Sequence, residues 1–346
     1  MHIEVGVLAD LGHAALCRAG MKDTDARLSA EVLVLADSWG IFTHGIKNLP
    51  GYLRRIDAGG IRRDGQPRVI AEGPAWAIVD GAQSLGMVGS VFAMDLALAK
   101  ARSAGFGYVG LGNSCHFGAA GCYAVRAAHD GMLGWAMAND TPTVTAPGAR
   151  GAVLGSNPFA FAAPVEGEDP LLLDFATSTV AGGKLFAAAA EGRKVPEGWV
   201  VDDAGRPTTD PSVWPKAGAL TPMAGHKGYG IALMIEVLSA VVTQGPAMAE
   251  VLSWSFADPS LPTGHSAAFL AMNVRAMPGG EALGRRLAEM ARRIRALPKA
   301  PEGGRILLPG EREWAFRKRA LREGLELPGD VAHAVDRLRE RCGIQP

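Results

Sequence analysis

The chain has no net charge, few cysteines and no long hydrophobic run. Its 346 residues carry 35 basic and 35 acidic side chains, and this balance argues against nucleic-acid binding by phosphate neutralisation. The four cysteines are scattered without metal-ligand spacing, which favours free thiols in a reducing compartment. The longest apolar run, after Gly230, contains Glu236 and is too short to span a bilayer. An N-terminus with Glu4 and Asp10 does not read as a signal peptide, so we expect a cytoplasmic protein.

Several familiar catalytic and phosphate-binding motifs are also missing. No HExxH, CxxC or GxSxG motif occurs. A literal GxGxxG spans Gly105–Gly110, but a helix is expected before it and a strand after it, the reverse of the dinucleotide fingerprint. The segment before Gly183 fails as a P-loop, since Ser178 stands at the first glycine and Leu185 replaces Ser or Thr. These absences argue against a Rossmann fold and a P-loop enzyme.

Apolar periodicity predicts helices toward both chain ends and strands in the middle, an α+β arrangement. The predicted division is a helical domain of residues 1–72 and 222–346 around a sheet-rich domain of residues 73–221. Residues 190–223, with Pro196, Pro207, Pro211 and Pro215, are predicted to be an extended surface connection. The expected helices are a segment capped by Thr24 and stopped by Gly40, one from near Thr43 to Gly59-Gly60, and 86–104, 228–242, 281–297, 311–323 and 329–342; the expected strands are 76–80, 108–111, 132–137, 159–163, 171–175 and 265–274.

Two histidines lie in glycine-bordered segments beside predicted helix starts. His116, within Leu111–Gly118, follows a predicted strand, and the helix after it offers free backbone N–H groups to an anion. His44, within Thr43-His44-Gly45, lies at a positive helix end, which lowers an imidazole pKa and suits proton exchange with a carbonyl oxygen. The structural alternative makes Thr43 an N-cap and both histidines non-catalytic. Two such histidines together favour a shared site.

Three further segments carry groups that suit a ligand. Gly225-His226-Lys227-Gly228 precedes an apolar helix, and its N–H groups and lysine suit a phosphate or carboxylate, the alternative being a plain glycine-rich helix start. Asp174 ends an apolar strand and can cap the following segment or accept a hydrogen bond from a ligand hydroxyl such as a ribose. Lys184 is either a solvated lysine or a substrate group.

These segments, in this order, resemble the malate/L-lactate dehydrogenase family of NAD(P)H-dependent oxidoreductases without a Rossmann fold. The resemblance extends from about residue 5 to residue 330. It implies a central mixed or antiparallel sheet that binds NAD or NADP, reversible hydride transfer to a 2-oxo acid or related carbonyl or imine, a homodimer, a small-molecule substrate, and no metal, nucleic acid or membrane. The matching motifs are Thr43–Gly45, Leu49–Leu53, Asn113–Gly118, Gly155–Pro158, Leu173–Ser178, Gly182–Lys184, Gly225–Gly230 and Leu308–Glu311.

The resemblance also implies roles for individual residues. His44, oriented by Thr43, is the expected proton donor, and His116 is expected to line the nicotinamide pocket; in the ureidoglycolate enzymes the donor is instead the histidine that matches His116. The residues expected to contact the cofactor are His116, Phe117, Gly118, Ala119, Ala120, Asp140, Asp174, Phe175, Ala176, His226, Lys227, Gly228, Pro309 and Gly310.

Two positions depart from the family pattern. Thr43 replaces a serine and keeps its hydroxyl. Asn48 replaces an arginine that clamps the substrate carboxylate, and an asparagine supplies neither charge nor a bidentate fork. Either the substrate is neutral at that end, or another cation serves, the candidates being Lys47, Arg54 and Arg150. The expected substrate residues are Asn48, Arg150 and Lys184. The segment 245–262 is also shorter and less regular than its family counterpart and is expected to border the substrate site. The alternatives are a ligand-binding homologue that has lost catalysis, and a hydrolase or lyase that uses His44 and His116.

Overall fold

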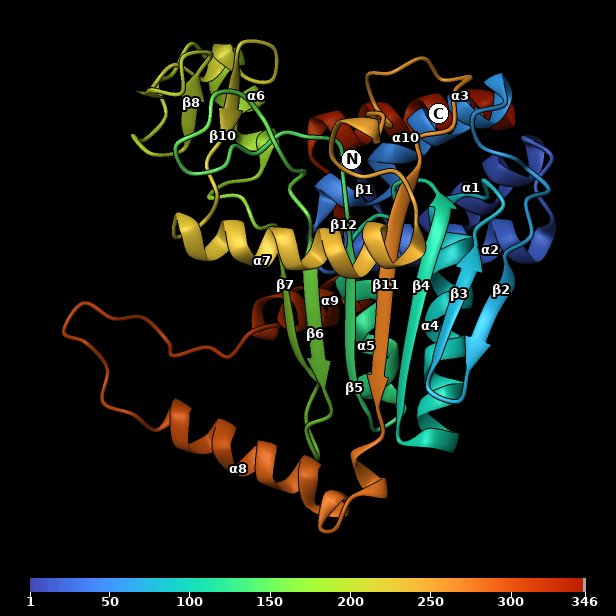
Figure 1. Cartoon of the computed structure of the whole chain (residues 1–346), viewed down its shortest axis with the longest axis vertical. Coiled ribbons are helices and arrows are strands. Elements are labelled where there is room, and N and C mark those ends of the chain that lie inside the picture. The colour runs from blue at the N-terminus through green and yellow to red at the C-terminus, as the bar shows by residue number, and fades with distance from the viewer. Residues whose placement is uncertain (345–346) are drawn as a thin grey trace.

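A computed structural model describes residues 1–344 of the chain and contains a central seven-stranded mixed sheet (Figure 1). Neighbouring strands are antiparallel except β3 and β4, which are parallel and are joined through a helix on one face of the sheet. The strands, in their order across the sheet, are β2 (Arg68–Gly73), β3 (Trp76–Asp80), β4 (Phe106–Ser114), β11 (His265–Met272), β5 (Leu133–Ala138), β6 (Phe159–Ala163) and β7 (Leu171–Phe175).

Helices cover both faces of this sheet. On one face lie α4 (Gly86–Ala104) and α5 (Gly121–His129), and on the other lies α7 (His226–Glu236), which continues as a π-helical turn over Val237–Val241 (Figure 1). The central strand β11 packs on both sides because side chains alternate along a strand. Ala267, Phe269 and Ala271 join the core under α4 and α5, whereas Ala268 and Leu270 pack on the α7 side.

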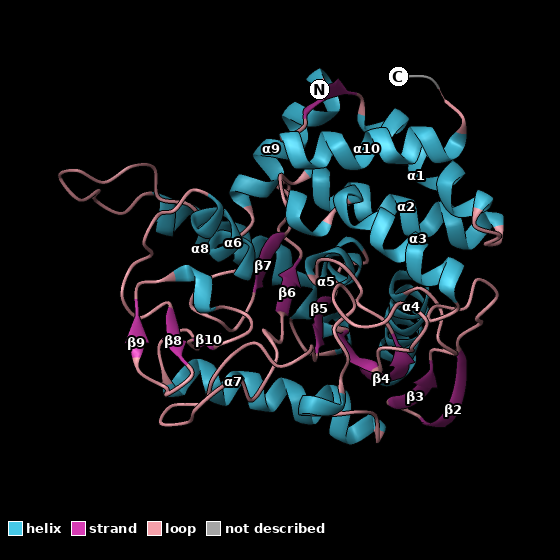
Figure 2. Ribbon diagram, turned by 90° about the horizontal axis from the view of Figure 1, so that it is seen from above, coloured by secondary structure: helices cyan, strands magenta, loops and turns pink. Residues whose placement is uncertain are grey.

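The two chain ends form one helical layer beside the sheet, as the sequence predicts (Figure 2). The first strand, β1 (His2–Ile3), pairs antiparallel with β12 (Leu325–Glu326), so the N-terminus is joined to the C-terminal helices. A single hydrophobic cluster runs from this layer to the α4 and α5 face of the sheet. The helices of the layer are α1 (Val5–Arg18), α2 (Asp23–Ser38), α3 (Leu49–Ala58), α9 (Glu311–Glu323) and α10 (Gly329–Cys342).

A small lobe replaces the extended surface connection predicted for residues 190–223. It holds a three-stranded antiparallel sheet of β8 (Val200–Asp202), β9 (Pro207–Thr208) and β10 (Gly218–Leu220), packed with α6 (Gly182–Ala190). The prediction was wrong because the prolines occupy turns and edges, while the buried side chains between them form a separate core. That core includes Val144, Val180, Leu185, Ala188, Val195, Val200 and Leu220.

Three other features differ from the sequence predictions. Helix α2 begins at Asp23 after Lys22, so Thr24 is not its cap. The predicted helical segments contribute strands to the sheet: β2 comes from residues 1–72 and β11 from residues 222–346. The helix predicted over 281–297 is shorter, and α8 (Leu283–Arg295) lies apart from the other terminal helices, beyond the far end of the sheet (Figure 1). Within residues 1–344, no helix combines the length and apolarity needed to cross a membrane.

Candidate active site

The segment that carries His44 is a pair of short 3-10 turns, not the start of an α-helix. These turns are Phe42–His44 and Ile46–Asn48, and the extended backbone of Gly45 separates them. The buried carboxylate of Asp37 on α2 accepts the N–H of Ile46 at 2.8 Å. A Cβ at Gly45 would come within 1.9 Å of the Asp37 carboxylate, so the glycine lets this carboxylate reach the backbone and interrupt the helix.

This geometry corrects the prediction of a single helix from near Thr43, which would have placed His44 and Asn48, four residues apart, on one face. Thr43 does not cap an α-helix, because α3 starts only at Leu49 with Asn48 as its N-cap. For the same reason His44 and Asn48 do not share the face of one helix. The amide nitrogen of Asn48 instead donates to the carbonyl of Thr43 at 3.0 Å, so its side chain closes the turn that holds His44.

His44 is oriented by its neighbour and lies beside the second histidine. The hydroxyl oxygen of Thr43 is 2.9 Å from Nδ1 of His44. Thr43 therefore contacts one ring nitrogen and does not contact the other, Nε2. The ring centroids of His44 and His116 are 5.8 Å apart. Burial lowers the pKa of His44, and the charge of Asp140 acts in the opposite direction. A neutral imidazole at this position can exchange a proton with a substrate atom.

His116 lies in the loop between β4 and α5 and is surrounded by aromatic rings. Its Nδ1 is 2.5 Å from the phenol oxygen of Tyr52 on α3. The indole of Trp254 stacks on the imidazole with centroids 4.7 Å apart and 18° between the planes. Burial, helped by the neighbouring His44, lowers the pKa of His116 to about 3. His116 is therefore a neutral ring at physiological pH, held by a phenol and an indole.

A carboxylate and a third histidine complete this cluster. His265, at the start of β11, has Nε2 3.1 Å from the carboxylate of Asp140 and Nδ1 2.9 Å from the hydroxyl of Thr263. Burial tends to raise the pKa of Asp140, but the hydrogen bond and charge of His265, together with His116, outweigh it and lower that pKa. The sequence predicted Asp140 as a cofactor contact. In the structure its carboxylate is the negative charge beside the three histidines.

The first helical turn after His116 is already bonded to a carboxylate. Asp174, at the end of β7, accepts the N–H of Gly121 at 2.8 Å. Burial raises the pKa of Asp174 to about 6, although this hydrogen bond acts in the opposite direction. The sequence predicted that the start of this helix would offer its N–H groups to an anionic ligand. That prediction was wrong for the N–H of Gly121, because the protein supplies the anion itself.

Backbone contacts connect the other predicted cofactor residues around the end of β7. A Cβ at Gly118, which has φ +81°, would lie 3.5 Å from the carbonyl oxygen of His44, so the 116–120 loop touches the His44 segment. Met223, just before α7, donates its N–H to the carbonyl of Thr177 at 2.9 Å. This contact brings the start of α7, with exposed His226 and Lys227 and buried Gly228, next to the segment that follows Asp174, Phe175 and Ala176.

The remaining predicted cofactor residues contact the first half of β7 or lie in the core. Pro309 accepts the N–H of Leu172 at 3.1 Å, and a Cβ at Gly310 would come within 2.8 Å of the Leu172 side chain. Phe117 is 3% exposed and stacks on Tyr123 in the core, so it can reach a ligand through its backbone only. Ala119 and Ala120 are buried beside it.

The predicted substrate residues are divided between two places. Asn48 and Trp254 line a cavity of about 700 Å³ between α3 and α10, together with Lys47 and Arg54. Arg150 and Lys184 are exposed and belong to the small lobe. Arg150 approaches the carbonyl of Asp203 at 3.4 Å, and Lys184 lies in the first turn of α6. Among the described residues, no hydrogen bond or ion pair joins either cation to the histidine cluster.

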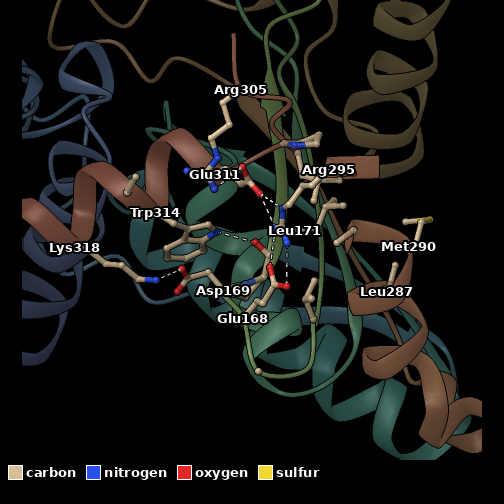
Figure 3. Close-up of a pocket in the computed structure, with 17 residues that line it drawn as sticks. Glu168, Asp169, Leu171, Leu287, Met290, Arg295, Arg305, Glu311, Trp314 and Lys318 are labelled. Carbon is tan, nitrogen blue, oxygen red and sulfur yellow. Dashed lines mark hydrogen bonds and ion pairs between the residues drawn. The ribbon is translucent and has the colours of Figure 1, made fainter. Parts of the chain in front are cut away.

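A second cavity, of about 410 Å³, lies at the other end of β7, between α8 and α9 (Figure 3). Arg295 of α8 points between two carboxylates, with its guanidinium 2.7 Å from Glu168 and 2.5 Å from Glu311. Trp314 donates its indole N–H to the carbonyl of Pro170 at 2.7 Å. Pro309 also lines this cavity, so it lies toward the start of β7, away from the end that carries Asp174.

Residues 1–344 contain one set of three side chains with metal-ligand geometry, and it lies on α1 and α2. It comprises His13, Cys17 and Asp23. Arg27 donates to Nδ1 of His13 at 2.9 Å, which leaves the imidazole proton on Nε2, 2.7 Å from Asp23. Both ring nitrogens of His13 are therefore engaged in a hydrogen-bond network with Arg27 and Asp23.

The sequence analysis assigned no site role to His265 or Arg55. It placed Tyr52 in a matching motif and Trp254 in the segment expected to border the substrate site, but named neither as a site residue. Arg55 is 1% exposed and donates to carbonyl groups of the 253–261 segment. One signal could have pointed to it. An irregular segment that packs on a helix needs donors for those of its carbonyl groups that water cannot reach. Arg55 follows the apolar pair Tyr52-Leu53 on α3, so it lies near a helix face that such a segment could cover.

Comparisons with known proteins agree over nearly the whole chain. A sequence model described as Malate/L-lactate dehydrogenase matches residues 3–336. The chain is 34% identical to the malate dehydrogenase of Pyrococcus abyssi (strain GE5 / Orsay), over 95% of this chain and 92% of that protein. It is 34% identical to the ureidoglycolate dehydrogenase (NAD(+)) of Escherichia coli O157:H7, over 96% and 94%. The solved structure of the sulfolactate dehydrogenase from Methanocaldococcus jannaschii superposes with a TM-score of 0.91 at 33% identity, over 99% and 98% of the two chains.

Proposed function

The chain belongs to the malate/L-lactate dehydrogenase family and is an NAD(P)-dependent oxidoreductase, and we propose that its site lies between His44, His116 and the end of β7. The reaction is reversible hydride transfer between nicotinamide C4 and the carbon that carries the oxygen or nitrogen of a 2-oxo acid, a related carbonyl or an imine. One observation supports this site best: Thr43 orients the ring of His44, and the centroid of that ring lies 5.8 Å from the centroid of the His116 ring.

The residues at this site fit a nicotinamide dinucleotide. The N-terminus of α7 is open, since His226 and Lys227 are exposed and a Cβ at Gly225 would have no atom within 4 Å. Such a helix start, with a lysine, suits a pyrophosphate. Asp174 offers carboxylate oxygens near the same place for a ribose hydroxyl. The bound dinucleotide supplies or accepts the hydride, and all other chemistry falls to the protein.

His44 provides the proton that balances the hydride. In the reductive direction Nε2–H of the imidazolium donates to the developing alkoxide or amide anion and leaves a neutral ring, and in oxidation Nε2 of that neutral ring accepts the proton. Thr43 at Nδ1 fixes the ring orientation. The nearby carboxylate of Asp140 stabilises the ring when it is charged. His116 stays neutral in its aromatic surroundings and forms a wall of the site.

The experiment is a screen of nicotinamide absorbance with purified protein, NADH and NADPH. The substrates are 2-oxo acids, cyclic imino acids and neutral ketones, each tested in the reductive direction. Cofactor oxidation that depends on one of them supports the proposal. Binding of dinucleotide without turnover of any substrate would favour the ligand-binding alternative, and absence of binding would favour the hydrolase or lyase alternative.

The assembly, the location and the domain roles also belong to this proposal. The outer side of α7 exposes Leu233 (44%), Val237 (42%) and Val241 (56%), an apolar stripe that a second copy of the chain would cover. A homodimer in solution, measured by light scattering, is the expected result.

We also assign the enzyme to the cytoplasm, and residues 73–221 to cofactor binding.

A further inference from the structure

Arg55 has an unusual position on α3. Its side chain is fully buried, yet no ion pair with it occurs among the described residues. All of its donors face backbone carbonyl groups of a single segment, residues 253–261. Nε donates to Trp254 at 2.5 Å, and the two Nη groups donate to Ser253 and Leu261 at 2.9 Å each. Two longer bonds reach Ala257 at 3.3 Å and Asp258 at 3.4 Å.

Apart from those to Arg55, the hydrogen bonds of residues 253–261 are internal to the segment, such as those from Ala257 to Ser253 and from Leu261 to Asp258. Residues 253–261 contain no helix or strand and are half-buried or exposed, so the carbonyl groups that face Arg55 have no partners from regular secondary structure. The segment also packs closely against the turn after α3, because a Cβ at Gly60 would come within 2.2 Å of the Pro259 carbonyl. A planar guanidinium offers five N–H donors in one fork, which a lysine ammonium cannot reproduce.

The residue that this segment delivers to the site is Trp254. Its indole stacks on His116 at 4.7 Å and lies 5.0 Å from the ring of Tyr52. A Cβ at Gly51 would come within 3.1 Å of the indole, so the glycine makes room for it on α3. The carbonyl of Trp254 itself accepts the shortest bond from Arg55. The guanidinium therefore fixes the backbone from which the indole reaches His116.

We propose that Arg55 is a positioning residue for substrate binding: it holds residues 253–261 so that Trp254 forms one wall of the substrate site against His116. This inference rests on the proposed function, since it assumes that substrate binds beside His44 and His116. Arg55 touches neither histidine, and the predicted cofactor residues lie on other elements. Its loss therefore weakens substrate binding more than cofactor binding.

The first test compares Arg55→Met and Arg55→Lys with Ile56→Val, a conservative change in the core on the same helix. We expect both Arg55 variants to raise KM for the substrate by about tenfold or more, with kcat changed by less than about threefold, the pattern of lost uniform binding. Dissociation constants for NADH and NADPH stay at the wild-type values. Ile56→Val lowers the melting temperature but leaves KM unchanged. Equal KM values in wild type and Arg55→Lys would overturn the proposal.

The second test is a double-mutant cycle with Trp254→Ala. If Arg55 acts through the indole, Arg55→Lys adds little to the KM of Trp254→Ala, whereas independent roles give multiplied effects. A KM for the double variant that equals the product of the two single effects would contradict the proposal. If wild type turns over no substrate, the proposed function fails, but the effect of Arg55 on residues 253–261 can still be measured. In that case faster amide hydrogen exchange in residues 253–261 of Arg55→Lys, but not of Ile56→Val, supports it, and unchanged exchange refutes it.

Discussion

The phenol oxygen of Tyr52 lies 2.5 Å from Nδ1 of His116. Burial raises the pKa of Tyr52 well above its ordinary value, so the phenol remains protonated. The pKa of His116 is lowered to about 3, which keeps the imidazole neutral as well. With this low pKa, and with Nδ1 in contact with the phenol, His116 is rarely protonated near neutral pH and is poorly suited to act as a general acid. This relationship favours His44 as the proton donor.

The first prediction concerns the division of roles between the histidines. His44→Ala should lower turnover by roughly 10²–10⁴-fold, the range for removal of a general acid. Cofactor affinity should be retained, because the predicted cofactor contacts of the 116–120 loop and of β7 remain in place. The measurements are kcat with a saturating substrate and a dissociation constant from cofactor fluorescence.

The companion variant is His116→Ala, which should retain more activity than His44→Ala. A near wild-type rate for His44→Ala together with an inactive His116→Ala would show that the roles are reversed. Tyr52→Phe is a matched control for His116→Ala, because it removes only the hydroxyl that contacts Nδ1 of His116 and keeps the imidazole.

Local sequence patterns predicted most single elements, because those patterns are local. The helices over 86–104, 311–323 and 329–342 and the strands over 76–80, 159–163 and 171–175 have the expected bounds. Periodicity does not specify which strands pair. For that reason β11, some 130 residues from its neighbour β5 in the chain, could not be placed at the centre of the sheet.

The candidate site could be predicted only in part for a related reason. His44 and His116 carry recognisable flanking glycines, and both lie in the cluster. Trp254 and Arg55 have no such local signal, because their positions depend on a contact between α3 and a segment about 200 residues later. The turn at Gly45 was missed because a buried carboxylate from another helix, Asp37, determines it.

The second prediction concerns pH and Asp37. Burial raises the pKa of this carboxyl to about 7, whereas it is about 3.9 in an unfolded chain. Between these values the folded state binds the proton and the unfolded state does not, so Asp37 makes the free energy of unfolding fall as pH rises from about 4 to about 7. Its stabilising contribution is fully present below pH 4 and lost above pH 7.

Asp37→Asn tests this linkage, since the amide keeps an oxygen for the N–H of Ile46 but cannot ionise. Urea unfolding should show the variant gaining stability relative to wild type between pH 5 and pH 8, by an amount on the order of a few kcal/mol. Asp203→Asn, at an exposed site, should show no such change. A difference that does not vary with pH would mean that Asp37 is ionised throughout this range.

The third prediction concerns the start of α7. Lys227→Ala should weaken the binding of NADH and NADPH several-fold while kcat changes little, because an exposed lysine at a helix N-terminus acts on phosphate and not on the reacting carbon. Isothermal titration gives the affinities. Lys22→Ala, at the start of α2, is the surface control. An unchanged dissociation constant for Lys227→Ala would remove this segment from the cofactor site.

The last prediction concerns Asn48, where related enzymes are expected to carry an arginine. Its amide closes the turn at Thr43 and borders the cavity beside Trp254, so it offers a carboxylate at most a neutral donor. Replacing two charge-assisted bonds in this way loses about 1–3 kcal/mol, and wild type should therefore reduce pyruvate and oxaloacetate poorly. Asn48→Arg should raise kcat/KM for both acids, and Asn48→Lys should raise it less because a lysine lacks the bidentate fork. Ordinary wild-type activity on these acids, combined with impairment by Asn48→Arg, would mean that another group holds the carboxylate.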